Sequence, residues 1–172
     1  MLKRLIQKCT SNNRKAQNEL YQAYAPTMLS VCLRYTNSKE EAEEVLMNGF
    51  VKVFSKIDSY TAVGNFEGWM RRIFIREALN YRKKFKLKWT RHSLLETDAW
   101  VKETDYSETD YLLNKLQSLP KGYKNIFNLF AIEGYKHREI AELLNISENT
   151  SKSQFRKAKN MLQNLCKDEY RR

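Results

Sequence analysis

The fold is decided near the end of the chain, where residues 137–150 have the sequence HREIAELLNISENT. A short helix is predicted there, because apolar side chains recur at helical spacing at Ile140, Ala141 and Leu144. Asn145 follows at a corner that favours a left-handed residue, for which Asn is second only to Gly. Ser147 is expected to cap a second helix. Two helices joined by such a tight corner are typical of a helix-turn-helix.

The second helix of this motif has two different sides. The side expected to face the core has spacings of four and three, at Ser151, Phe155, Ala158, Leu162 and Leu165. The other side carries hydrogen-bond donors for phosphates and base edges, at Asn149, Lys152, Ser153, Arg156 and Lys157. Because a helix fits the major groove, these five are candidate contacts to duplex DNA. The alternative is a helical hairpin whose basic side is merely solvated.

Outward from this motif the chain changes character twice. Helical periodicity covers residues 111–132 and ends at Gly134, which is expected to be a left-handed cap. Before it, aliphatic residues are sparse and acidic ones gather, at Glu96, Asp98, Glu103, Asp105, Glu108 and Asp110. This composition predicts an acidic flexible linker. The sequence therefore predicts domains at 1–87 and 111–172, joined by a linker at 88–110.

The first domain also follows a helical period. Pro26 is expected to interrupt a helix that continues from Met28 to Tyr35. Ser38 is expected to cap the next helix, which runs to about Ile57 and buries Ala42, Val45, Leu46, Gly49, Phe50, Val53 and Phe54. A last helix is expected from about Phe66 to Lys84. No strand pattern is present, so the expected fold is all-α, with two small helical domains.

The last helix of the first domain interleaves aromatic and basic side chains, directly after a turn at Gly64-Asn65. Aromatic rings stack on unpaired bases, and Arg and Lys hold phosphates. The candidate contacts to a melted strand are Tyr60, Asn65, Phe66, Arg72, Arg76 and Asn80. The alternative is that the apolar side chains are core, and for Trp69, Ile73 and Leu79 it is the preferred interpretation.

Composition limits the function classes. The 172 residues have a net charge of +11, which indicates a polyanionic partner. Three distant cysteines and two histidines favour reduced thiols and no metal site. A phosphate loop and a nucleophile–base arrangement are both missing, so we expect no catalytic residues, no small-molecule substrate and no cofactor. We also expect a cytoplasmic protein without membrane insertion, because the sequence has no long apolar run and no secretory start.

Three segments in order resemble the extracytoplasmic-function, or ECF, subfamily of RNA polymerase sigma factors. The first is the acidic, apolar stretch at 40–54. The second is Phe66-Glu67-Gly68-Trp69-Met70-Arg71-Arg72-Ile73, and the third is Leu119-Pro120 followed by the helix-turn-helix. The resemblance covers about residues 5–87 and 108–167. The chain departs from the family pattern at Met47, Asn48, Arg76, His137, Asn145 and Ser151.

The resemblance implies an alternative sigma factor. The helix at 40–54 would bind the β′ clamp of core RNA polymerase, with Glu43, Glu44, Leu46, Met47 and Phe50 as the candidate contacts. The first domain would capture the melted promoter strand, and the second would recognise the upstream duplex element. The β flap of polymerase would be a further partner. The linker would pass through the RNA-exit channel. Family members are often held by an anti-sigma protein, and no residue establishes one here.

Two other interpretations stay open at this point. One is a helix-turn-helix regulator that does not bind polymerase. The other is a single-strand RNA-binding module built on the basic aromatic helix. Each explains one half of the chain, and neither gives a task to the acidic apolar helix at 40–54.

Overall fold

The computed structural model describes residues 2–61, 64–89 and 114–167, with side chains described up to Tyr81 in the second of these ranges. Within these ranges every regular element is a helix and no strand occurs, which confirms the predicted all-α fold. The helices of the described ranges form two compact units, one before residue 90 and one after residue 113. No helix of the described ranges combines the length and apolar character needed to cross a membrane.

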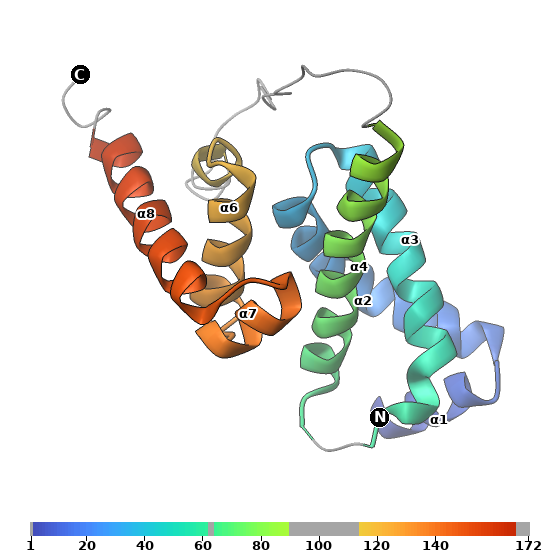
Figure 1. The fold of residues 1–172 in the computed structure, drawn as a ribbon. Helices are drawn as coiled ribbons and strands as arrows, with labels where there is room; N and C mark the ends of the chain where they lie inside the picture. Colours follow the sequence, from blue (N-terminus) through green and yellow to red (C-terminus); the bar gives the residue numbers. More distant parts are fainter. Residues whose placement is uncertain (1, 62–63, 90–113, 168–172) are drawn as a thin grey trace. The chain divides into compact units, whose positions relative to one another are not determined.

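The first unit is a helical bundle whose elements are α1 (Leu2–Thr10), α2 (Arg14–Tyr35), α3 (Lys39–Lys56), η1 (Ile57–Ser59, a 3-10 turn) and α4 (Phe66–Trp89). Helices α2, α3 and α4 pack on one another, and α1 packs on α2 (Figure 1). Their shared core is fully buried, at Leu20, Met28, Tyr35, Val45, Val53, Met70 and Phe74. Ser38 Oγ accepts from the Glu41 N–H at 3.2 Å, which confirms the predicted cap of α3.

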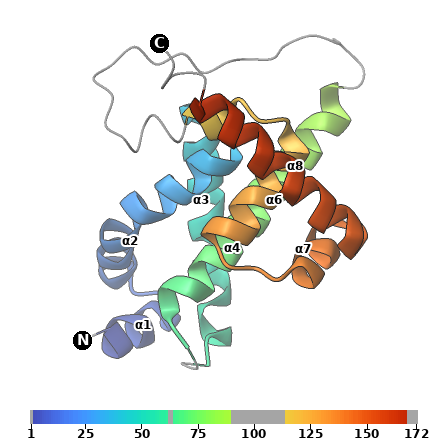
Figure 2. The ribbon, with the colours of Figure 1, turned by 90° about the vertical axis from the view of Figure 1, so that its left-hand side faces the viewer.

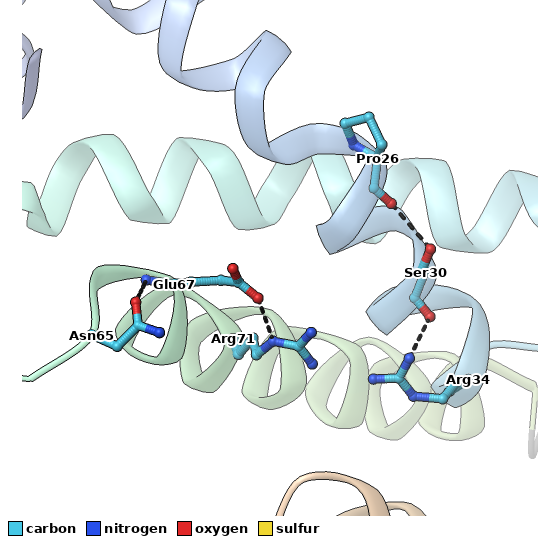
Figure 3. A network of polar contacts seen from close by, with 6 residues as sticks. All are labelled: Pro26, Ser30, Arg34, Asn65, Glu67 and Arg71. Atoms are coloured by element: carbon cyan, nitrogen blue, oxygen red, sulfur yellow. Dashed lines mark hydrogen bonds and ion pairs between the residues drawn. The ribbon is translucent and has the colours of Figure 1, made fainter. Parts of the chain in front are cut away.

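Two predicted boundaries in this unit were wrong. Pro26 does not interrupt the helix, because α2 runs through it from Arg14 to Tyr35. The lost backbone donor is tolerated because buried residues on both sides of Pro26 fasten α2 to the bundle, and Ser30 Oγ donates to the Pro26 carbonyl at 3.1 Å (Figure 3). Helix α4 continues past Lys84 to Trp89, the last described residue of this range, since lysine and arginine favour helix and no breaker intervenes.

The second unit begins with helical residues 114–117 and continues with α6 (Lys121–Phe127), η2 (Asn128–Ile132, a π-helical segment), α7 (His137–Leu144) and α8 (Glu148–Lys167). Ile126, Leu129, Ile140 and Ala158 are its buried apolar centre. Gly134 has a φ of 74°, and the Tyr135 N–H donates to the Leu129 carbonyl at 2.9 Å. The predicted glycine cap is thus confirmed. The predicted linker residues 90–110 lie outside the described residues, and the predicted domain limits stay predictions.

All three cysteines are free thiols. Cys9 and Cys32 are buried, and burial raises the pKa of Cys32 to about 12. A thiol with so high a pKa forms little thiolate at neutral pH and is a poor nucleophile.

Gly49 sets how closely α3 approaches α4. A Cβ atom at Gly49 would fall on the ring of Phe74, which is fully buried in α4. The ring cannot move aside without displacing its neighbours. The close approach of α3 to α4 therefore needs a glycine at this position.

We expect Gly49→Ala to destabilise the first unit by about 1–3 kcal/mol, the usual cost of overpacking. Urea unfolding followed by circular dichroism would measure it. Gly68→Ala is the matched control, because a Cβ there meets nothing closer than 4.0 Å. Alanine is the better helix former, so the control should gain up to about 1 kcal/mol. Equal stabilities for the two variants would contradict the role given to Gly49.

Candidate nucleic-acid and polymerase interfaces

The helix-turn-helix corner has the geometry that the sequence predicted. Asn145 is left-handed, with φ and ψ both 55°, and the Ile146 N–H donates to the Ala141 carbonyl at 3.0 Å. Ser147 Oγ accepts from the Thr150 N–H at 3.0 Å and so caps α8. Helices α7 and α8 are seen from two sides in Figures 1 and 2. The predicted corner and cap are both confirmed.

Helix α8 turns its polar side to solvent. The five candidate DNA contacts are all exposed, at Asn149, Lys152, Ser153, Arg156 and Lys157, while Ser151 and Ala158 on the opposite side are buried. Lys152 Nζ lies 2.6 Å from Glu148 Oε1, and this bond and the lysine charge lower the pKa of the Glu148 carboxyl. Ser153 Oγ donates to the Thr150 carbonyl at 3.1 Å. One side of α8 therefore offers donors and positive charge over more than two turns.

A contact between α7 and α8 was not predicted from the sequence. His137 Nδ1 lies 2.9 Å from the Oγ of Ser151, fourteen residues further along. Ser151 stands on the inner side of α8, where the period predicts an apolar residue. A serine on the apolar side of a helix needs a hydrogen-bond partner, and this was the one feature of the sequence that could have indicated the contact.

The turn before α4 is fixed by two hydrogen bonds. Tyr60 Oη donates to the Gly64 carbonyl at 2.8 Å, and Gly64 has a φ of 86°. Asn65 Oδ1 accepts from the Glu67 N–H at 3.0 Å, as Figure 3 shows. Asn65 is exposed and Tyr60 is half-buried. Both residues therefore shape the turn, while the amide nitrogen of Asn65 remains a donor that a base can use.

Phe66, which the sequence analysis selected as a candidate strand contact, lies in the core of this structure. The side chain is only 2% exposed. Its ring stacks on Trp69, with centroids 5.5 Å apart, and meets Tyr24 and Tyr60 edge-on. The helical period places Phe66 on the same side as Met70, so it anchors the start of α4 in the core. The aromatic residue at this turn therefore serves as a packing anchor.

The outer side of α4 keeps the other predicted contacts together. Arg72, Arg76 and Asn80 are all exposed and lie four residues apart, so they line one side of the helix. Arg71 is different, because its Nε is 3.0 Å from Glu67 Oε1 within the same helix (Figure 3). In the part of α4 whose side chains are described, the stripe at 72, 76 and 80 is thus open to a polyanion.

Helix α3 buries two of its five predicted polymerase contacts. Leu46 is 5% exposed and Phe50 is 3% exposed. The Phe50 ring packs on Tyr21 and Phe74, with centroids 4.7 and 5.2 Å apart. These two residues belong to the core because they lie on the side of α3 that faces α2 and α4. Their predicted place on the buried stripe of this helix is confirmed, and neither side chain is offered at the surface.

The outer side of α3 is apolar and acidic. Met47 is 57% exposed and Val51, which the sequence analysis did not select, is 65% exposed. The two stand one helical turn apart, beside exposed Glu43 and Glu44. Two large apolar side chains left in water at neighbouring positions are typical of a docking surface.

Two polar contacts fasten this helix to α4. Glu44 Oε2 accepts from Tyr81 Oη at 2.7 Å, and the buried Glu77 pairs with Lys52 Nζ. Burial and the bond to Glu44 raise the pKa of Tyr81, so the phenol stays protonated. The docking side of α3 and the basic stripe of α4 thus belong to two helices that are joined by these polar contacts.

These three surfaces offer donors, positive charge and exposed apolar area, which suit macromolecular partners. No cluster of three or more potential metal ligands occurs in the part of the chain that the structure describes.

Comparisons with known proteins agree with this arrangement. The protein-family model of sigma-70 region 2 matches residues 20–87 of the sequence, and the family model of sigma-70 region 4 matches residues 109–162. The chain is 24% identical to the ECF RNA polymerase sigma-E factor of Haemophilus influenzae, over 93% of this chain and 92% of that one. It is 22% identical to the ECF sigma factor SigW of Bacillus subtilis, over 98% of both chains. The chain belongs to the ECF subfamily of sigma factors.

This alternative sigma factor therefore directs promoter-specific transcription initiation, and its partners are core RNA polymerase and promoter DNA. The two alternatives without polymerase are not favoured, since both sigma regions stand in one chain in the family order. Solved structures support the fold. The sigma factor RpoE of Bartonella quintana, solved with the anti-sigma factor NepR, has a TM-score of 0.59 at 17% identity, over 87% of this chain and 96% of that one. CnrH has a TM-score of 0.54 at 18% identity, over 95% and 96%.

Proposed function

We propose that the two units of this sigma factor divide the work of promoter recognition. The second unit recognises the upstream duplex element with the exposed side of α8. The first unit docks on the polymerase clamp through α3 and captures the melted strand with α4 and the turn before it. The observation that carries this proposal is that all five candidate DNA contacts of α8 are exposed, on a helix that begins at the Ser147 cap.

The clamp contact is proposed for Met47 and Val51, with Glu43 and Glu44 at their border. Apolar side chains supply the affinity when water leaves them, and the carboxylates select a partner surface with basic residues. Glu44 is already bonded to Tyr81, so the acidic contribution rests mainly on Glu43. This assignment replaces Leu46 and Phe50 by Val51 among the contact residues.

The capture of the melted strand is proposed for the stripe Arg72, Arg76 and Asn80, together with Tyr60 and Asn65 at the turn. Arginine side chains at four-residue spacing follow a phosphate backbone, and an asparagine amide can bond a base edge. The stripe leaves Phe66 out, because its ring lies in the core.

We expect the double variant Arg72→Ala, Arg76→Ala to form about tenfold less open complex, because two phosphate contacts to the single strand are lost. Permanganate reactivity of unpaired thymines, measured with holoenzyme on promoter DNA, gives the amount of open complex. Arg71→Ala is the matched control, since Arg71 is engaged by Glu67 and should change little. Open complex at the wild-type level in the double variant would refute this role for α4.

The remaining partners are inferred from the family. We propose that the second unit also contacts the β flap of polymerase, and that an anti-sigma protein is a further partner, as NepR is for RpoE of Bartonella quintana. The chain would act in the cytoplasm, where polymerase and promoters are. Bond chemistry would belong to polymerase, and this chain would supply the promoter address and strand separation.

The proposal is tested by transcription in vitro with core RNA polymerase and a promoter library. Specific transcripts are expected only when this chain is added. The upstream sequences of those transcripts should share an element that is lost when Lys152 and Ser153 are both changed to alanine. Transcripts that start at the same promoters without this chain, or with no shared upstream element, would refute the proposal.

A further inference from the structure

His137 connects the two helices of the helix-turn-helix. Its ring stacks on Phe130, with centroids 4.2 Å apart and an interplanar angle of 13°, and it meets Phe155 of α8 at 5.8 Å. Its Nδ1 lies 2.9 Å from Ser151 Oγ. Ser151 is fully buried, so this ring nitrogen satisfies a hydroxyl that water cannot reach. The ring is thus held on two sides by aromatic rings and at one atom by a hydrogen bond.

The position of this bond on α8 is what gives it a function. Ser151 is followed directly by Lys152 and Ser153, the proposed base contacts. A hydrogen bond has a narrow range of length and angle, whereas stacked apolar rings can slide on each other. The bond therefore fixes the rotation and depth of α8 at the turn that reads the DNA.

We propose that His137 is a positioning residue for promoter recognition, which sets through Ser151 the base pairs that Lys152 and Ser153 face. This inference rests on the proposed function of α8 as the helix that reads the upstream element. It assigns His137 no contact with DNA, because its effect is exerted on the helix that makes the contacts.

The charged groups near the ring make this device sensitive to pH. Lys152 and Glu148 face it from α8, Arg138 of α7 acts on Glu148, and the packed partners Phe130 and Phe155 carry no charge. Burial, and then the Lys152 cation, lower the pKa of His137 below its ordinary 6.5, while Glu148 opposes this. A protonated ring would attract Glu148 away from Lys152, so that a reading side chain would change its partner.

The direction of the pH effect follows from the lowered pKa. Because the folded ring releases its proton more readily than an unfolded one, the neutral ring is the stable folded form. The contribution of the neutral ring to the stability of the folded unit is complete above the ordinary pKa of 6.5. It is lost as the pH falls through the lower pKa of the folded state. Recognition by the wild type should therefore weaken on acidification.

The test uses the full chain in holoenzyme and promoters randomised over the upstream element. The best selected promoter and a scrambled one are then compared, and the ratio of their affinities is the readout. Protonation near phosphates affects both promoters alike, so the ratio reports positioning and not general attraction to DNA. Four variants separate the parts: His137→Phe keeps a stacking ring without the bond, Ser151→Ala removes the hydroxyl, His137→Asn keeps a bonding atom near the Nδ1 position, and Gln163→Ala is an exposed control on α8.

His137→Phe and Ser151→Ala should each lower the ratio about tenfold. Each removes one partner of the bond, so either the other partner loses its hydrogen bond or α8 shifts. The variant with both changes should fall no further, because both remove the same bond. His137→Asn should keep the ratio at pH 7.5 and lose the decrease that we expect for the wild type as the pH falls below the ordinary histidine pKa of 6.5. The control should behave as the wild type.

Lys152→Ala distinguishes the two ways in which this inference can fail. If it lowers the ratio while His137→Phe and Ser151→Ala do not, the positioning role is refuted and the proposed function of α8 stands. If Lys152→Ala also leaves the ratio unchanged, the proposed function of α8 falls, and the inference with it. Additive losses in the double variant, or equal weakening on both promoters by variants with wild-type circular dichroism, would reduce His137 to a structural residue and overturn the inference.

Discussion

Replacing Met47 and Val51 together by serine is expected to weaken binding of this sigma factor to core RNA polymerase by about 30-fold or more. Each side chain is more than half exposed, so the change removes apolar area from a surface and leaves the core intact. Burying a Met or Val side chain stabilises a complex by about 1.5–3 kcal/mol when burial is complete. Partial burial of both gives about 2–4 kcal/mol, and each 1.4 kcal/mol is a factor of ten in affinity. Fluorescence titration of the labelled chain with core polymerase would measure the loss.

The matched control is Leu2→Ser in the same unit. Leu2 is also an exposed large apolar residue, 39% exposed, but it stands in α1 and not in the proposed contact. It should bind polymerase as the wild type does. An unchanged dissociation constant for the α3 variant, with a wild-type circular dichroism spectrum, would remove α3 from the polymerase interface. Polar changes at Leu46 or Phe50 would not test this, because they would unfold the core first.

The features of the second unit that were predicted from the sequence are local ones. Asn145 and Ser147 act on backbone groups within five residues of themselves, so a short stretch of sequence contains both partners of each contact. The glycine cap at Gly134 and the serine cap at Ser38 are local in the same sense. Such signals depend on backbone geometry and on side chains that bond the nearby backbone, and tertiary packing does not override them here.

The side of α3 that faces polymerase was predicted only in part. Helical spacing showed that a stripe of α3 is apolar, but a stripe that includes Met47, Phe50 and Val51 is wider than the side that α2 and α4 cover. Which edge of it stays exposed depends on where Tyr21 and Phe74 approach, and these residues belong to other helices. The same reason explains Phe66, whose partners Tyr24 and Tyr60 come from earlier elements.

The bond between His137 and Ser151 shows a different limit. A serine on the inner side of α8 predicts a polar partner, yet fourteen residues separate it from the histidine that supplies one. The two residues meet because of the angle between α7 and α8. That angle is set by the folded corner at Asn145 and cannot be obtained from the spacing of residues in the sequence. Neither residue indicates the other from sequence spacing.

The second large effect is expected on the outer side of α8. Lys152→Ala and Ser153→Ala should each cost about 1–3 kcal/mol on the selected promoter and relax the preference at one base pair, which is the behaviour of a base contact. Both side chains are exposed and extend from the turn that follows the Ser147 cap. The Ser153 hydroxyl bonds only the Thr150 carbonyl of the same helix, at an exposed position. Its loss should therefore leave folding unaffected. Holoenzyme binding to a library of upstream elements would measure both quantities.

Lys152→Ala has a second consequence that a control must separate. Lys152 is paired with Glu148, and its removal leaves a carboxylate facing the DNA phosphates. That repulsion would lower affinity for every sequence and could be mistaken for lost base recognition. In the background of Glu148→Gln the repulsion is absent, so any remaining loss of preference at one base pair belongs to Lys152 itself.

We propose that Arg156, one turn further along α8, contacts a phosphate, so it should behave differently from Lys152 and Ser153. Arg156→Ala should weaken binding to all upstream sequences alike and lower the slope of log affinity against log salt by about one unit. Lys157 can be either a base contact or a phosphate contact, and Lys157→Ala distinguishes the two. A changed preference at one base pair indicates a base contact, and a changed salt slope alone indicates a phosphate contact. Titrations of holoenzyme at several salt concentrations with a selected and a scrambled promoter give both numbers. If the alanine variants at 152, 153 and 157 keep both affinity and preference while circular dichroism stays that of the wild type, α8 does not read the promoter.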